Sequence, residues 1–277
     1  MPRSILALVT LLLCLGGAVR AEPRPAPAAL DTLIQRSGLD DQLAQFEGAM
    51  QRGITQVHER EPSLREGDLA RMRKAVADAY APSRLRPALR AELAKSISRA
   101  EIAAALAWVD SPAGRRLEAL EKKASTPEGL SRLEAAARRG APPLAAARAQ
   151  TLHALVKATR ADEVAATILI ETAVGIQEGF ASNGPDTSQA TVAQMRKGLE
   201  SEREKLSASL HEQSFIAFAL VYQGASDADL AALLGFARSP AGVRYYAVTS
   251  RAFATTLGQA AKRAGSALVV PAAPADI

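Results

Sequence analysis

Cysteine is almost absent from this chain: its 277 residues include only one, Cys14. That residue lies in an apolar run near the N-terminus, and a mature chain without it has no disulfide, thiolate metal site or cysteine nucleophile. Histidine is scarce too, with three residues, none at metal-ligand spacing from another. Neither H-E-x-x-H nor G-x-S-x-G occurs. We therefore expect no catalytic residues, no metal and no cofactor.

Long apolar runs are also missing after the first 21 residues. The opening stretch MPRSILALVTLLLCLGGAVRA has a basic start, a short apolar run and a small-residue end. This order is typical of a secretory signal peptide, here residues 1–21 with cleavage after Ala21. The less favoured alternative is an uncleaved membrane anchor, for which the run is short. We predict an exported, periplasmic protein with no transmembrane segment after cleavage.

A concentrated block of one charge is missing as well. The net charge is +5, and the basic residues are interspersed with acidic ones along the chain. Nucleic-acid binding needs a basic patch or stripe. We therefore expect that nucleic acid is not a partner.

The chain does contain an internal repeat. The segment IAAALAWVDSPAGRRL (102–117) aligns with LAALLGFARSPAGVRY (230–245), each residue number differing by 128 from its counterpart. A weaker match upstream, LARMRKAV (69–76) with VAQMRKGL (192–199), keeps the same order. Self-similarity of this kind indicates duplication of a structural unit. We predict two tandem helical modules, module 1 at 30–138 and module 2 at 150–264.

Each module has the periodicity of helices rather than strands. Apolar residues recur at helical spacing, for example at Leu69, Met72, Val76 and Tyr80, and no long alternating stretch interrupts them. The predicted fold is therefore all-α and bundle-like, without a sheet. The segments outside the modules are expected to be a Pro/Ala-rich linker at 22–29, a second linker at 139–149 and a disordered tail at 265–277.

The four-residue motif SPAG occurs once in each module. A residue before proline is pushed out of helical geometry, while serine caps a new helix and proline fits its first position. The motif thus predicts a sharp corner between two helices, with its glycine admitting a close neighbouring helix. A functional alternative is an anion or partner site at the helix start, helped by a nearby arginine. The residues concerned are Ser111, Pro112, Gly114, Arg116, Ser239, Pro240, Gly242 and Arg244.

The stretches SRAEIAAALAWVDSPAGRRL and SDADLAALLGFARSPAGVRYY resemble the domain-of-unknown-function family numbered 2059. The family's usual signature is similar to F-Y-x-S-P-x-G; here Trp108 and Phe236 take the aromatic position, while Val109 and Ala237 replace the tyrosine. The resemblance implies a bacterial exported helical protein and supplies no catalytic residues. Two copies in one chain depart from the simplest family pattern.

Aromatic residues concentrate in module 2, where they indicate either a larger core or a groove for a ligand or partner. The residues of such a groove would be Phe215, Phe218, Tyr222 and Tyr246. The favoured function is a non-catalytic protein-interaction module in the bacterial cell envelope, which binds an envelope protein or itself. The alternative is a periplasmic protein that binds a small ligand or lipid through the aromatic groove. A metal-assisted enzyme is the least favoured interpretation.

Overall fold

The computed structural model describes residues 25–182 and 186–269, so the expected signal peptide and most of the expected tail lie outside the described residues. The described chain is built of helices without a strand, which confirms the all-α fold class. The helices are α1 (Pro27–Arg36), α2 (Leu39–Arg60), α3 (Glu66–Tyr80), α4 (Pro82–Leu93), α5 (Arg99–Val109), α6 (Pro112–Ser125), α7 (Pro127–Ala137), α8 (Ala146–Thr159), α9 (Ala161–Ala181), α10 (Asp186–Ser201), α11 (Arg203–Val221), α12 (Asp227–Arg238) and α13 (Pro240–Leu268).

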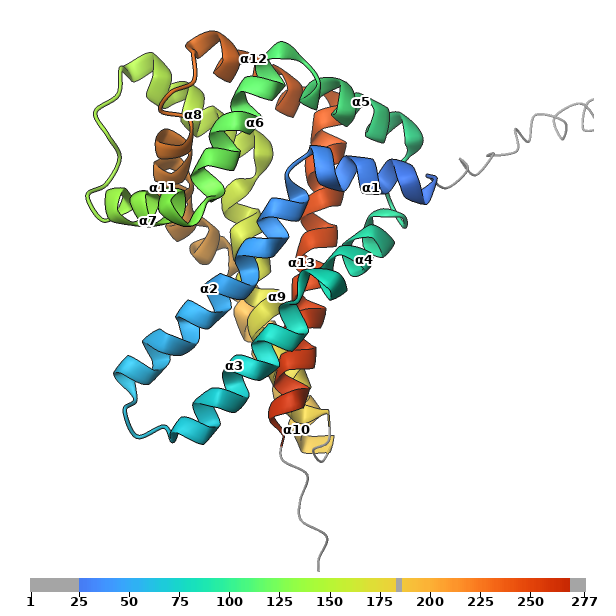
Figure 1. The fold of residues 1–277 in the computed structure, drawn as a ribbon, viewed down its shortest axis with the longest axis vertical. Coiled ribbons are helices and arrows are strands. Elements are labelled where there is room, and N and C mark those ends of the chain that lie inside the picture. The colour runs from blue at the N-terminus through green and yellow to red at the C-terminus, as the bar shows by residue number, and fades with distance from the viewer. Residues whose placement is uncertain (1–24, 183–185, 270–277) are drawn as a thin grey trace, which may run out of the picture.

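The long helix α13 runs through the middle of the molecule with α9 beside it (Figure 1). Small residues allow these two helices to approach closely. A Cβ atom added at Gly175 of α9 would overlap the carbonyl oxygen of Gly258 on α13, and one added at Gly265 would overlap that of Ile176. The α9–α13 pair is therefore the structural axis around which the other helices are arranged.

The largest hydrophobic core joins the two halves of the chain. Leu85, Leu89 and Leu93 of α4 are completely buried, and they belong to the same cluster as Phe253 and Leu257 of α13. A second cluster combines α6 of the first half with α8, α11 and α12 of the second. The expected modules 30–138 and 150–264 therefore do not have separate cores: each half completes the core of the other.

Both SPAG corners form as the sequence predicts. The Ser111 hydroxyl accepts a hydrogen bond from the Gly114 N–H at the start of α6, and Ser239 accepts one from Gly242 at the start of α13, each at 3.0 Å. The short helix before the first corner begins with a capping box, in which Ser98 and Glu101 bond each other's backbone N–H.

The glycine of each corner is required by the helix that precedes it. A Cβ at Gly114 would overlap the carbonyl oxygen of Trp108 in the last turn of α5, and one at Gly242 would overlap that of Phe236 in α12. The helix that approaches each corner glycine closely is thus the one that precedes the corner, α5 or α12. A third corner of this kind, unnoticed in the sequence, joins α6 to α7, where Thr126 caps the N–H of Gly129.

Helix boundaries differ modestly from the expected segments. Helix α1 begins at Pro27, inside the expected 22–29 linker, and α8 begins at Ala146, inside the expected 139–149 linker. Helix α13 extends to Leu268, past the expected start of the tail at 265, because Ala264 and Gly265 are buried in the helix packing. Helix ends that are held by packing are poorly marked in composition.

Helix α9 is also more apolar than expected. By length and composition it would suffice to cross a membrane, although the sequence indicated no such segment after residue 21. In the structure α9 packs against α13, α10 and α11. Its Glu171 and Glu178 are both bonded by Arg196 of α10. Helix α9 therefore contacts most of the other helices of the second half.

Candidate functional site

A cavity of about 470 Å³ lies between the two halves, where α5, α6 and α7 face α11, α12 and α13. Much of its wall is apolar, formed by Trp108, Val109, Leu117, Leu130, Leu133, Phe218, Val221 and Leu233. Helices from both halves are needed to enclose it. Its size falls within the range of small-molecule binding sites.

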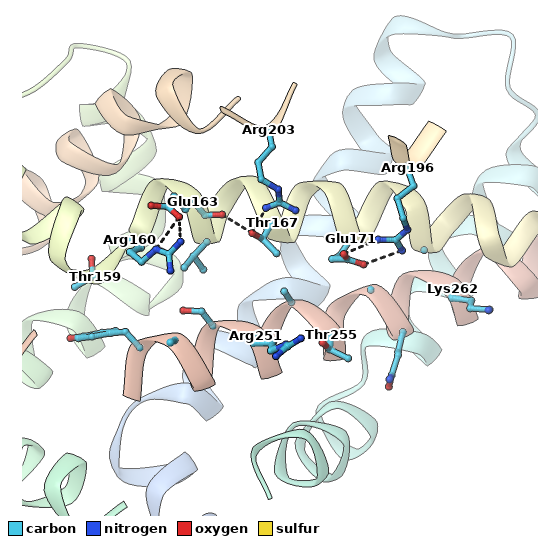
Figure 2. Close-up of a pocket in the computed structure, with 18 of the residues that line it drawn as sticks. Thr159, Arg160, Glu163, Thr167, Glu171, Arg196, Arg203, Arg251, Thr255 and Lys262 are labelled. Carbon is cyan, nitrogen blue, oxygen red and sulfur yellow. Dashed lines mark hydrogen bonds and ion pairs between the residues drawn. The ribbon is translucent and has the colours of Figure 1, made fainter. Parts of the chain in front are cut away.

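A groove of about 590 Å³ lies along α9 and α13, with α10 and α11 above it (Figure 2). Four residues line both this groove and the cavity: Thr159, Val164, Tyr246 and Ser250. The cavity between the halves (the inner cavity) and the groove on the second half (the outer groove) therefore adjoin where α8 meets α9 and along the first turns of α13. Charged side chains are more numerous on the wall of the outer groove.

The polar centre of the cavity is Glu121 of α6. Leu117 is buried one helical turn before it, so the helix presents both residues to the same side. The Tyr222 hydroxyl of α11 donates a hydrogen bond of 2.6 Å to Glu121 Oε1. Burial raises the pKa of Glu121 above its usual value, and the hydrogen bond from Tyr222 offsets part of that rise.

Two further tyrosines, Tyr245 and Tyr246, lie at the start of α13. Their rings meet edge to face with centroids 5.3 Å apart. Tyr245 packs into the main core, and burial raises its pKa to about 12. Burial also raises the pKa of Tyr246, which lines both the groove and the cavity. Both phenols are therefore neutral hydrogen-bonding groups near neutral pH.

The outer groove is lined by charged side chains, most of which are paired. Figure 2 shows Arg160 on Glu163, Arg196 on Glu171, and Arg203 on the Thr167 hydroxyl. Lys262 also pairs with Glu178, at 3.4 Å. Among the described residues Arg251 is the groove cation without an ion pair. The groove wall consequently has a net positive charge, with five basic and three acidic side chains.

Arg160 has an unusual backbone conformation where the groove begins. Its φ of 55° places it in the left-handed region, which a non-glycine residue rarely adopts. It ends α8 and directly precedes α9, so the turn between these helices depends on it. Its pair with Glu163, three residues on, holds the side chain across the first turn of α9.

Arg116 and Arg244, which follow the two SPAG corners, bind acidic residues across the two halves. Arg116 donates to both carboxylate oxygens of Asp229 at the start of α12, with contacts of 2.6 to 3.2 Å. Arg244 donates to Glu101 at the start of α5, at 2.9 Å. Ser111, Pro112, Ser239 and Pro240 form the corners themselves, and Gly114 also lines the cavity.

Three of the four residues of the expected aromatic groove lie at the site. Phe218 and Tyr222 line the cavity, and Tyr246 lines both hollows. Phe215 is buried instead, with its ring stacked on His153 at a centroid distance of 4.0 Å. Of the four residues expected to form the aromatic groove, one therefore packs in the core against α8 and three line the cavity.

Two features of this region escaped sequence reasoning. Glu121 has a local signal, since it follows the buried Leu117 by one turn on an otherwise charged helix. His153 and His211 have none: they are far apart in sequence, yet their ring nitrogens lie 3.3 Å apart, and His211 also bonds Asp162 at 2.9 Å. Within residues 25–182 and 186–269, no group of three or more His, Cys, Asp or Glu side chains is arranged to hold a metal ion.

Comparisons with known proteins give no match. No family model, no curated protein and no solved structure matches this chain. The resemblance to the family numbered 2059 in the two SPAG segments therefore stays a prediction.

Proposed function

We propose that this chain is an exported, periplasmic, non-catalytic protein that binds a small amphipathic molecule between its two halves. The ligand lies in the inner cavity, where its apolar body contacts the apolar wall, and any part that extends beyond the cavity contacts the outer groove. Of the two functions expected from the sequence, the geometry favours ligand binding. Export rests on the sequence pattern of residues 1–21.

The observation that carries this proposal is that the cavity and the groove adjoin each other. Hollows of about 470 and 590 Å³ share Tyr246 and Ser250 on their walls. An apolar wall provides the area that a small molecule buries, and a few polar groups fix its orientation. The two adjoining hollows offer both kinds of surface to one bound molecule.

Blocking the junction tests the proposal. We expect the purified protein to bind the neutral fluorescent probe N-phenyl-1-naphthylamine at one site. Ser250→Trp should weaken that binding at least about tenfold, because Ser250 lines both hollows and the indole would occupy space in them. Ser209→Trp is the matched control, since Ser209 is exposed on α11 and lines neither hollow.

Circular dichroism should show wild-type helix content in both variants. Equal probe binding by the wild type and Ser250→Trp, or no binding by the wild type, would contradict ligand binding at this site.

Interaction with an envelope protein, or with a second copy of the chain, is the second candidate. Helix α9 leaves Leu169 51% and Phe180 41% exposed. They are 11 residues apart, which is three helical turns, so they lie along one face. Crosslinking in the native envelope should yield one dominant partner attached near this face if the second candidate holds.

We also propose that the two halves arose by duplication. Glu101 and Arg116 of the first half match Asp229 and Arg244 of the second, each pair of numbers differing by 128. Arg116 binds Asp229 while Arg244 binds Glu101. This reciprocity is the contact pattern of a two-fold symmetric dimer, here contained within one chain.

A further inference from the structure

The inner cavity contains a carboxyl group that the protein leaves without a cation. Within the described residues, Glu121 has the Tyr222 hydroxyl as its side-chain partner and no ion pair. The other carboxylate on the cavity wall, Glu118, is paired with Lys122 at 2.7 Å. The one basic residue on the wall, Arg36, is paired with Asp110. The cavity wall therefore offers one unmatched acidic group.

Leaving a carboxyl group unpaired in such a place is unfavourable. A charge that is partly removed from water is unfavourable unless a partner compensates, so the group either stays protonated or binds a cation. A purely structural role would be met by an apolar side chain or an amide. Glu121 instead lies on the wall of a cavity that adjoins the outer groove.

The surroundings of Glu121 suit an organic cation. Trp108, Phe218, Tyr222 and Tyr246 all line the same cavity. Aromatic faces attract ammonium groups, most strongly where water is excluded. A carboxylate and several aromatic rings around an apolar cavity are the groups that recognise a substituted ammonium. An anionic head would meet Glu121 without a compensating base.

We propose that the ligand carries an ammonium group on an apolar body and that this group pairs with Glu121 inside the cavity. This inference rests on the proposed function, because it specifies the chemistry of the molecule that enters the same site. The neutral alternative is a ligand with a hydroxyl group, which would hydrogen-bond a protonated Glu121.

Three probes with the same chain distinguish these possibilities. Decyltrimethylammonium, decanol and decyl sulfate would be titrated into the wild-type protein by calorimetry, below their aggregation concentrations. We expect the ammonium to bind about tenfold more tightly than decanol and the sulfate to bind most weakly. Glu121→Gln should remove the preference for the ammonium and leave decanol binding within about twofold, since glutamine keeps the shape and still accepts from Tyr222.

Glu212→Gln is the control, because Glu212 is exposed on α11 and lines neither hollow. Equal binding of all three probes, or a preference for the ammonium that survives Glu121→Gln, would overturn the inference while leaving ligand binding intact. If none of the three probes binds and N-phenyl-1-naphthylamine does not bind either, the proposed function itself fails.

Discussion

Trp108 lies face to face with Phe236, with ring centroids 5.1 Å apart and ring planes 7° from parallel. These residues hold matching positions in the two repeated segments, immediately before the two SPAG corners. The same two segments are joined by the reciprocal pairs Arg116–Asp229 and Arg244–Glu101. The matching segments therefore meet each other directly, and the cavity lies beside this contact, with Trp108 on its wall.

Removing the serine cap of the second corner should cost stability without changing the fold. Ser239→Ala deletes the acceptor for the Gly242 N–H at the start of α13. We expect a loss of about 1 kcal/mol in the free energy of unfolding, with helix content retained. Urea denaturation measures this loss. Ser209→Ala on the exposed face of α11 is the control, and an equal effect there would refute the capping interpretation.

Adding one methyl group at the same corner should cost more. In Gly242→Ala the new Cβ would overlap the carbonyl oxygen of Phe236, which belongs to backbone and cannot rotate away. We expect a destabilisation of about 1–3 kcal/mol, or failure to fold. Gly235→Ala, one turn before that corner on α12, has nothing within 4 Å of its added Cβ. It should be neutral or stabilising by up to about 1 kcal/mol, and comparable losses in both variants would contradict this account.

The Arg116–Asp229 pair should make stability sensitive to acid. The hydrogen bonds from Arg116, and then from Ser226, lower the pKa of Asp229 from 3.8 to about 2. A folded-state pKa below the unfolded one means that the unfolded chain binds the proton more readily. The stabilisation is therefore complete above pH 3.8 and is lost as the pH falls towards 2.

Melting temperatures measured across that range test this prediction. The wild-type protein should lose more stability between pH 4 and pH 2 than Asp229→Asn, which is expected to be less stable at neutral pH and flatter in acid. Glu212→Gln removes an exposed carboxylate on α11 and should keep the wild-type slope. Identical slopes in the wild type and Asp229→Asn would show that the pair does not form.

Binding of an ammonium probe should become tighter as the pH rises. Burial raises the pKa of Glu121 above 4.5, so a cation that needs the carboxylate must displace its proton at lower pH. The ionisable groups around it are Glu118 on the same helix, Arg36, and the phenols of Tyr222, Tyr245 and Tyr246. The phenols stay neutral because burial raises their pKa values.

Calorimetry of decyltrimethylammonium in buffers with different ionisation enthalpies measures this linkage. We expect proton release on binding below the pKa of Glu121, decreasing to none above it. The Glu121→Gln variant should show no such release. Proton release that persists in Glu121→Gln would assign the linkage to another group.

The features that the sequence predicts correctly depend on residues close together in the chain. Ser111 and Ser239 are recognisable as caps because a serine before a proline can act only on the adjacent backbone. The alignment of repeats shows that Trp108 and Phe236 are equivalent, but it does not show that they touch each other. That contact depends on packing between the halves, in which α6 contacts α12 and α13 contacts α5.

The cavity could not be predicted from the sequence, because it depends on contacts between distant segments. Its walls come from segments near residue 36 and near residue 250, so no spacing along the chain brings them together. The sequence does show that Glu121 follows an apolar residue, Leu117, by one helical turn. Only the structure shows that its side-chain partner is the hydroxyl of Tyr222, 101 residues later, and not a cation.

The most direct test of the account is a crystal structure of the protein with 10-bromodecyltrimethylammonium, in which the anomalous signal of bromine locates the end of the chain. We expect a molecule within the cavity between α6, α11 and α13, with its ammonium group against the Glu121 carboxylate and the ring of Tyr222. An empty cavity under saturating ligand, or a molecule bound outside it, would show that the ligand does not bind at Glu121.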